Sequence, residues 1–77
     1  MLRISRKTLA SEYDCSTRTV DRCIREIEEL IGTRYPLNSV IRAPSVKLRA
    51  DVARDYMEHR AEIHQGTAPE FGGGKGL

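Results

Sequence analysis

The segment SRKTLASEYDCSTRTVDRCIREIEELIG, residues 5–32, contains two amphipathic helical patterns separated by a short break. Ser5 is a suitable N-cap because its hydroxyl can accept from a free backbone N–H, and a first helix is predicted over about residues 6–13. Asp14 and Ser16 mark the break, since aspartate tolerates a left-handed backbone and serine caps a following helix.

The second pattern begins at Thr17 and is the longer one. Its apolar residues recur at spacings of three and four and therefore share one helix face: Val20, Cys23, Ile24, Ile27, Leu30 and Ile31. Gly32 then stands where a C-cap glycine ends a helix. Two helices of about 8 and 15 residues joined by a tight turn form a helix-turn-helix. The segment predicts this motif.

A hairpin and a third helix are expected after the motif. Pro36 and Pro44 exclude a continuous helix over residues 33–49. Two short strands are predicted there, over residues 40–42 and 46–48. The third helix is expected over about residues 50–64, with these residues facing inward: Val52, Ala53, Tyr56, Met57 and Ile63.

The predicted fold is therefore mainly α with a small β-hairpin, a winged helix-turn-helix that occupies residues 1–65. Residues 66–77 are rich in glycine and poor in apolar residues, so they are expected to form a disordered C-terminal tail. A chain of 77 residues has room for one domain at most.

Composition and charge limit the function classes. No apolar run approaches the roughly 18 residues that span a bilayer, and residues 1–7 do not resemble a secretory signal. A cytoplasmic protein without a membrane partner is expected, and its two cysteines are expected to be reduced thiols. Residues 1–49 contain ten Lys or Arg and six Asp or Glu residues, whereas residues 50–77 contain three and five. A basic N-terminal part suits a polyanionic partner.

The second helix carries a basic stripe opposite its apolar face. Arg18, Arg22 and Arg25 lie at positions i, i+4 and i+7, where they are suited to read the major groove, because arginine can bond bidentately to guanine. The alternative is a solvated face with intrahelical ion pairs. Three such pairs are possible at i, i+4: Asp21–Arg25, Arg22–Glu26 and Arg25–Glu29.

Other polar residues complete a predicted interface with double-stranded DNA. Ser16 and Thr17 lie at the N-terminus of the second helix, where free N–H groups favour phosphate. Four basic residues are candidates for the DNA backbone, two from the first helix and two from the hairpin: Arg6, Lys7, Arg42 and Lys47. A purely structural hairpin that covers the core is the alternative for the wing.

The helix-turn-helix residues resemble a known signature. Leu9-Ala10, Cys15-Ser16, Thr19-Val20 and Cys23-Ile24 are similar to "LA…(G)VS..TV..(h)I", with Asp14 in place of the usual glycine and Cys15 in place of valine. Together with the hairpin and final helix, the chain resembles the small excisionase-like and MerR-like winged-helix domains over about residues 4–62.

This resemblance implies DNA binding, often cooperative and with bending. Excisionases of this group are bacterial or phage proteins of mobile elements that set the direction of recombination as architectural partners of a recombinase. Some relatives regulate transcription instead. A recombinase, or another copy of the chain on DNA, is thus an implied partner.

Enzymatic and metal sites are not expected. Cys15 and Cys23 are too far apart for a close zinc-binding pair, and the two histidines lie far along the chain, at positions 59 and 64. No residues suggest a catalytic base and nucleophile in one pocket, and no cofactor is predicted. The competing class is a protein-interaction module that uses an acidic surface on the last helix: Asp51, Asp55, Glu58 and Glu62.

Overall fold

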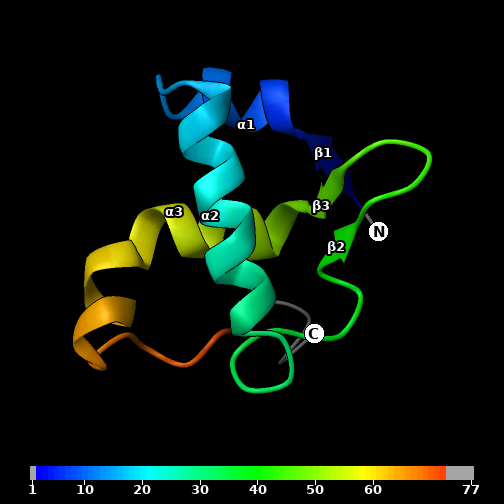
Figure 1. Ribbon diagram of the computed structural model, residues 1–77. Coiled ribbons are helices and arrows are strands. Elements are labelled where there is room, and N and C mark those ends of the chain that lie inside the picture. Colours follow the sequence, from blue (N-terminus) through cyan, green and yellow to red (C-terminus); the bar gives the residue numbers. More distant parts are fainter. Residues whose placement is uncertain (1, 73–77) are drawn as a thin grey trace.

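The computed structural model describes residues 2–72 as three helices and a small three-stranded antiparallel sheet (Figure 1). In chain order the elements are β1 (Arg3–Ser5), α1 (Arg6–Glu12), α2 (Thr17–Glu29), β2 (Val40–Ile41), β3 (Lys47–Arg49) and α3 (Ala50–Gln65). The architecture is mixed α/β and is compatible with a winged helical fold.

The two predicted helices and the turn between them are present, with the predicted caps. The Ser5 hydroxyl accepts from the Thr8 N–H at 3.1 Å, and the Ser16 hydroxyl accepts from the Thr19 N–H at 3.2 Å. Asp14 adopts a left-handed backbone with φ 52°. Its short polar side chain allows this conformation at lower cost than most residues would incur. Both helix starts are therefore fixed by local sequence.

Helix α2 ends at Glu29, before the predicted Ile31. Beyond it the Leu30 carbonyl accepts backbone N–H groups from three successive residues, Thr33, Arg34 and Tyr35, at 2.9–3.1 Å. This tight turn satisfies a carbonyl that the end of the helix leaves free. Gly32, with φ 94°, lies inside the turn rather than directly after the last helical residue.

The sheet contains the predicted hairpin and a strand that the sequence did not predict. Strands β2 and β3 pair antiparallel, and β1 pairs with the other side of β3, which places Ile4 opposite Leu48. The sequence pattern indicates no strand before the first helix. Three residues are too few to display an alternating pattern, and their partner strand lies more than forty positions away.

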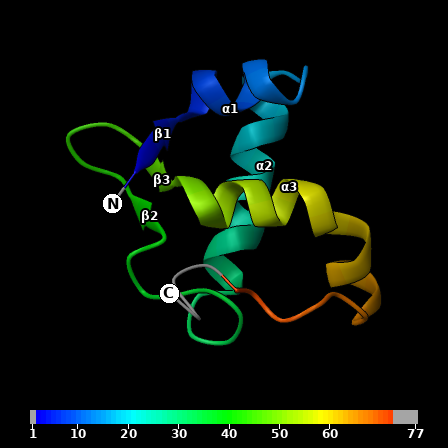
Figure 2. The same ribbon diagram turned by 180° about the vertical axis from the view of Figure 1, so that it is seen from behind.

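Helix α3 packs across the inner face of α2 (Figures 1 and 2). As predicted, Val52, Ala53 and Tyr56 are buried, and Met57 and Ile63 are partly buried against the core. The helix is kinked at His59 and ends at Gly66, whose left-handed backbone caps it. The core joins every helix to the sheet and consists of these residues: Ile4, Leu9, Ala10, Val20, Cys23, Ile24, Ile27, Tyr35, Leu48, Ala50, Val52, Ala53, Tyr56 and Phe71.

Part of the expected disordered tail makes an ordered contact. Phe71 is buried and packs edge-on against Tyr35, with ring centroids 5.2 Å apart. The segment that follows α3 thus returns to the turn after α2 (Figure 2). Residues 73–77 of the predicted tail lie outside the described residues.

Candidate nucleic-acid interface

The outer face of α2 presents the three predicted arginines. Arg18, Arg22 and Arg25 are all exposed and surround a shallow hollow together with Asp21. None of the three arginines forms an ion pair or a side-chain hydrogen bond within residues 2–72. Their guanidinium groups are therefore available to a ligand.

The intrahelical ion pairs that were the alternative for this face are not formed. Asp21 binds Arg6 of α1, and Glu26 lies 3.4 Å from the His64 ring and 4.0 Å from the Arg60 guanidinium of α3. Glu29 has no ion pair among the described residues. Two of the three expected carboxylate partners of the arginines are thus held by other elements.

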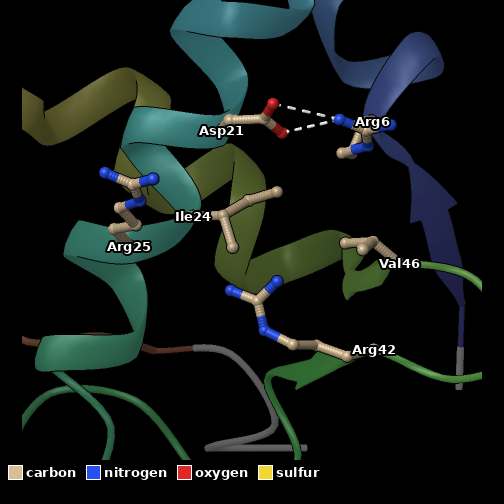
Figure 3. A pocket seen from close by; sticks show the side chains of 6 residues that line it. All are labelled: Arg6, Asp21, Ile24, Arg25, Arg42 and Val46. Carbon is tan, nitrogen blue, oxygen red and sulfur yellow. Dashed lines mark hydrogen bonds and ion pairs between the residues drawn. The ribbon is translucent and has the colours of Figure 1, made fainter.

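A cleft separates α2 from the hairpin, and three arginines border it (Figure 3). Arg6 comes from the start of α1, Arg25 from α2, and Arg42 directly follows β2. The other lining residues are Asp21, Ile24 and Val46. The structure therefore brings two of the predicted backbone-binding residues, Arg6 and Arg42, to the same cleft as one of the predicted base-reading residues.

Two carboxylates of α2 bind the arginines that border the cleft from α1 and from the hairpin. One nitrogen of Arg6, Nη1, donates to both oxygens of Asp21, at 2.8 and 3.0 Å. Arg42 donates through Nε and Nη2 to the two oxygens of Glu28, at 3.0 and 2.7 Å. The hydrogen bonds from Arg42 to Glu28 raise the pKa of that guanidinium. Neither pair uses every donor of its arginine, and the remaining donors stay free for a phosphate.

Sequence reasoning considered Asp21 only as an ion-pair partner of Arg25 and did not name Glu28. These two carboxylates are seven residues apart, hence two turns along the same side of α2, the side toward the hairpin. That spacing was readable in the sequence. Their partners were not, because Arg6 lies 15 residues from Asp21 and Arg42 lies 14 residues from Glu28.

The remaining predicted site residues line neither the hollow on the outer face of α2 nor the cleft beside the hairpin. Thr17, Lys7 and Lys47 are exposed, on the first turn of α2, the first turn of α1 and strand β3 respectively. The Ser16 hydroxyl caps α2 and also lies 3.1 Å from the Thr19 hydroxyl. Lys7 and Lys47 form no ion pair with another described residue.

The acidic residues of α3 contact other parts of the fold and differ in exposure. Asp55 accepts from the Arg34 guanidinium at 3.0 Å and from the Tyr35 hydroxyl at 2.8 Å, and its side chain is only 13% exposed. Asp51 accepts from Arg49 at 2.7 Å, and Glu58 accepts from the Tyr13 hydroxyl at 3.2 Å. Asp55 therefore serves the fold, whereas Asp51, Glu58 and Glu62 stay partly exposed.

No helix among residues 2–72 is long and apolar enough to cross a membrane. Within the same residues, His, Cys, Asp and Glu side chains do not gather in threes as metal ligands would. Cys23 is buried in the core, which raises the pKa of its thiol, and Cys15 is half-buried in the turn before α2.

Comparison of the chain with protein-family models, with curated proteins and with solved structures finds no match.

Proposed function

We propose that this protein binds double-stranded DNA through α2 and the β2–β3 hairpin. The observation that carries the proposal is the exposed stripe of Arg18, Arg22 and Arg25 on the second helix of a helix-turn-helix, where no carboxylate pairs with them among the described residues. In such a motif the second helix enters the major groove and its N-terminal half contacts the base edges.

The interface residues divide into two roles. Arg18 and Arg22, near the start of α2, are assigned to the base edges, with Thr17 and Arg25 beside them. Arg6, Lys7, Arg42 and Lys47 flank α2 and are assigned to the phosphates of the DNA backbone. Ser16 contributes by capping α2, whose N-terminal N–H groups favour a phosphate.

This function requires no catalytic step, cofactor or metal ion. Within it, we favour the role implied by the excisionase-like resemblance, an architectural factor that sets the direction of recombination on a mobile element in the cytoplasm. A recombinase or a second copy bound to adjacent DNA is then the protein partner. A small transcriptional regulator would use the same interface on an operator. A protein-interaction module is the second alternative. It would use the partly exposed Asp51, Glu58 and Glu62 of α3, whereas Asp55 is bound within the fold.

Selection from randomised duplex DNA, followed by sequencing and salt titration of the winners, tests the proposal. A compact enriched motif whose affinity falls steeply with salt is the expected result. Direct repeats of the motif favour the architectural role, and an inverted repeat favours a dimeric regulator. Absence of both enrichment and salt-sensitive binding would contradict DNA binding itself.

Arg18→Ala tests whether Arg18 contacts a base edge. It should weaken binding to the selected site about tenfold and relax the preference at one base pair. Arg54→Ala is the control, because Arg54 is an arginine of α3 bound to Glu12. Equal weakening by Arg18→Ala on every sequence would reassign Arg18 to a phosphate.

A further inference from the structure

Asp21 is an acidic residue at the border of this basic interface. Together with Arg25 it borders both hollows of this surface, the one on the outer face of α2 and the cleft beside the hairpin. It is the one carboxylate that lines either of them among the described residues. Its side chain is 48% exposed although it is bound to Arg6. Figure 3 shows the carboxylate beside the cleft, between Arg6 and Arg25.

A carboxylate at this place disfavours general binding to DNA. It repels phosphates, so it weakens binding at every position along the duplex where it would face the DNA backbone. Its favourable contact in the major groove is with an exocyclic amino group, and aspartate accepts from the N4 amino group of cytosine. Asp21 lies one turn into α2, in the half of a recognition helix that meets the base edges.

Asp21 and its arginine neighbours on α2 match the edge of a G·C pair. Guanine presents two acceptors in the major groove, N7 and O6, and its partner cytosine presents one donor, the N4 amino group. Arg22 or Arg25 supplies donors for the guanine, and the carboxylate of Asp21 supplies an acceptor for the cytosine. An arginine and an aspartate that line one hollow of α2 can thus read one base pair together.

Arg6 holds the carboxylate in place while leaving it able to accept. Each Asp21 oxygen receives one hydrogen bond from the same Arg6 nitrogen, at 2.8 and 3.0 Å. A carboxylate has about four acceptor positions, so each oxygen keeps one for a base. The bond to Arg6 restricts rotation of the short side chain and offsets part of its charge.

From these observations, and on the basis of the DNA-binding function proposed above, we propose that Asp21 determines specificity for a G·C pair by accepting from cytosine N4, and that Arg6 is its positioning residue.

The test compares Asp21→Asn with Glu12→Gln. Glu12→Gln is a matched control, because Glu12 is also a half-exposed carboxylate bound by an arginine of another element, Arg54, at 2.9 and 3.2 Å. Both variants lose one negative charge and one ion pair between elements. The selected motif, the affinity for it and the affinity for random duplex are measured for both, with thermal unfolding to verify folding.

Asp21→Asn should lower the preference for one G·C pair about tenfold and leave binding to random duplex equal or tighter. Glu12→Gln should leave the selected motif unchanged. In the selected site, replacing that cytosine by a pyrimidinone without the amino group should weaken binding by the wild-type protein and have little effect on Asp21→Ala. Arg6→Gln should relax the preference at the same base pair as Asp21→Asn.

The outcomes separate the two proposals. If the wild-type protein selects a motif and Asp21→Asn selects it with unchanged preference, as Glu12→Gln does, the role of Asp21 is wrong while DNA binding stands. If Arg6→Gln weakens binding equally on all sequences and leaves the preference at that base pair unchanged, Arg6 acts only as a phosphate contact and does not position Asp21. If the wild-type protein neither selects a motif nor binds duplex DNA, the proposed function itself is wrong.

Discussion

At the scale of the single residue, Asp55 shows how a charge can serve the fold rather than the surface. The sequence places it in a like-charged row on α3, and the structure surrounds it with Arg34, at 3.0 Å, and the Tyr35 hydroxyl, at 2.8 Å. The side chains of Asp55 and Arg34 are 13% and 14% exposed. Loss of one partner from a largely buried pair leaves the other charge without compensation.

Asp55→Asn should therefore lower the free energy of unfolding by about 3 kcal/mol. Asp14→Asn is the control, because Asp14 is exposed and asparagine tolerates the same left-handed backbone. Urea unfolding followed by circular dichroism measures both. A loss below about 0.5 kcal/mol for Asp55→Asn is the size expected of a surface substitution. It would mean that water solvates the Arg34 guanidinium as well as the carboxylate does.

Tyr35 predicts a loss of stability at alkaline pH. Burial, and then the hydrogen bond to Asp55, raise the pKa of its hydroxyl from the ordinary value of 10.0. The folded protein keeps the proton above the pH at which the unfolded chain releases it. Tyr35 thus makes its full contribution to the free energy of unfolding below about pH 10. This contribution falls as the pH rises toward the pKa of Tyr35 in the folded protein.

The urea midpoint of the wild-type protein should decrease between pH 8.5 and 10.5 by more than that of Tyr35→Phe, since phenylalanine has no proton to lose. Tyr13→Phe is the comparison. Burial also raises the pKa of Tyr13, but its side chain is more exposed. Parallel pH profiles for the wild-type protein and Tyr35→Phe would contradict the assignment.

At the scale of the element, sequence reasoning succeeded where the cause is local. The N-caps Ser5 and Ser16 act within three residues of their partners, and the apolar period of α2 repeats within one turn. Strand β1 and the Arg6–Asp21 pair were missed because their partners lie 15 or more positions away. The candidate interface was therefore predictable in its arginines and not in the carboxylates that organise its border.

Ser16→Ala tests how far α2 depends on its cap. The Ser16 hydroxyl accepts from the Thr19 N–H at 3.2 Å, and without it that donor at the start of α2 loses its partner. The variant should lose about 1 kcal/mol of unfolding free energy. Ser11→Ala, on the exposed side of α1, should change it by less than about 0.5 kcal/mol. Equal losses in the two variants would show that the turn, rather than the cap, fixes the start of α2.

At the scale of the whole molecule, internal ion pairs leave the unpaired positive charge of the described residues in the part of the chain before α3. Among residues 2–72, the basic side chains without an ion pair are Arg3, Lys7, Arg18, Arg22, Arg25 and Lys47. All of them precede α3 and belong to α1, α2 or the sheet. Arg54 and Arg60, the arginines of α3, both face carboxylates. The available positive charge is thus concentrated on the elements that form the candidate interface.

Arg25→Ala and Arg60→Ala remove the same charge from α2 and from α3, so their comparison separates a positioned interface from attraction by net charge. A positioned interface predicts that Arg25→Ala weakens binding to the selected duplex and lowers the salt slope by about 0.9, the value for one phosphate contact, or relaxes one base preference instead. Arg60→Ala should leave affinity, slope and motif unchanged. Equal effects of the two variants would mean that DNA responds to the total charge of the molecule, and the assignment of α2 as the DNA-binding helix would fail.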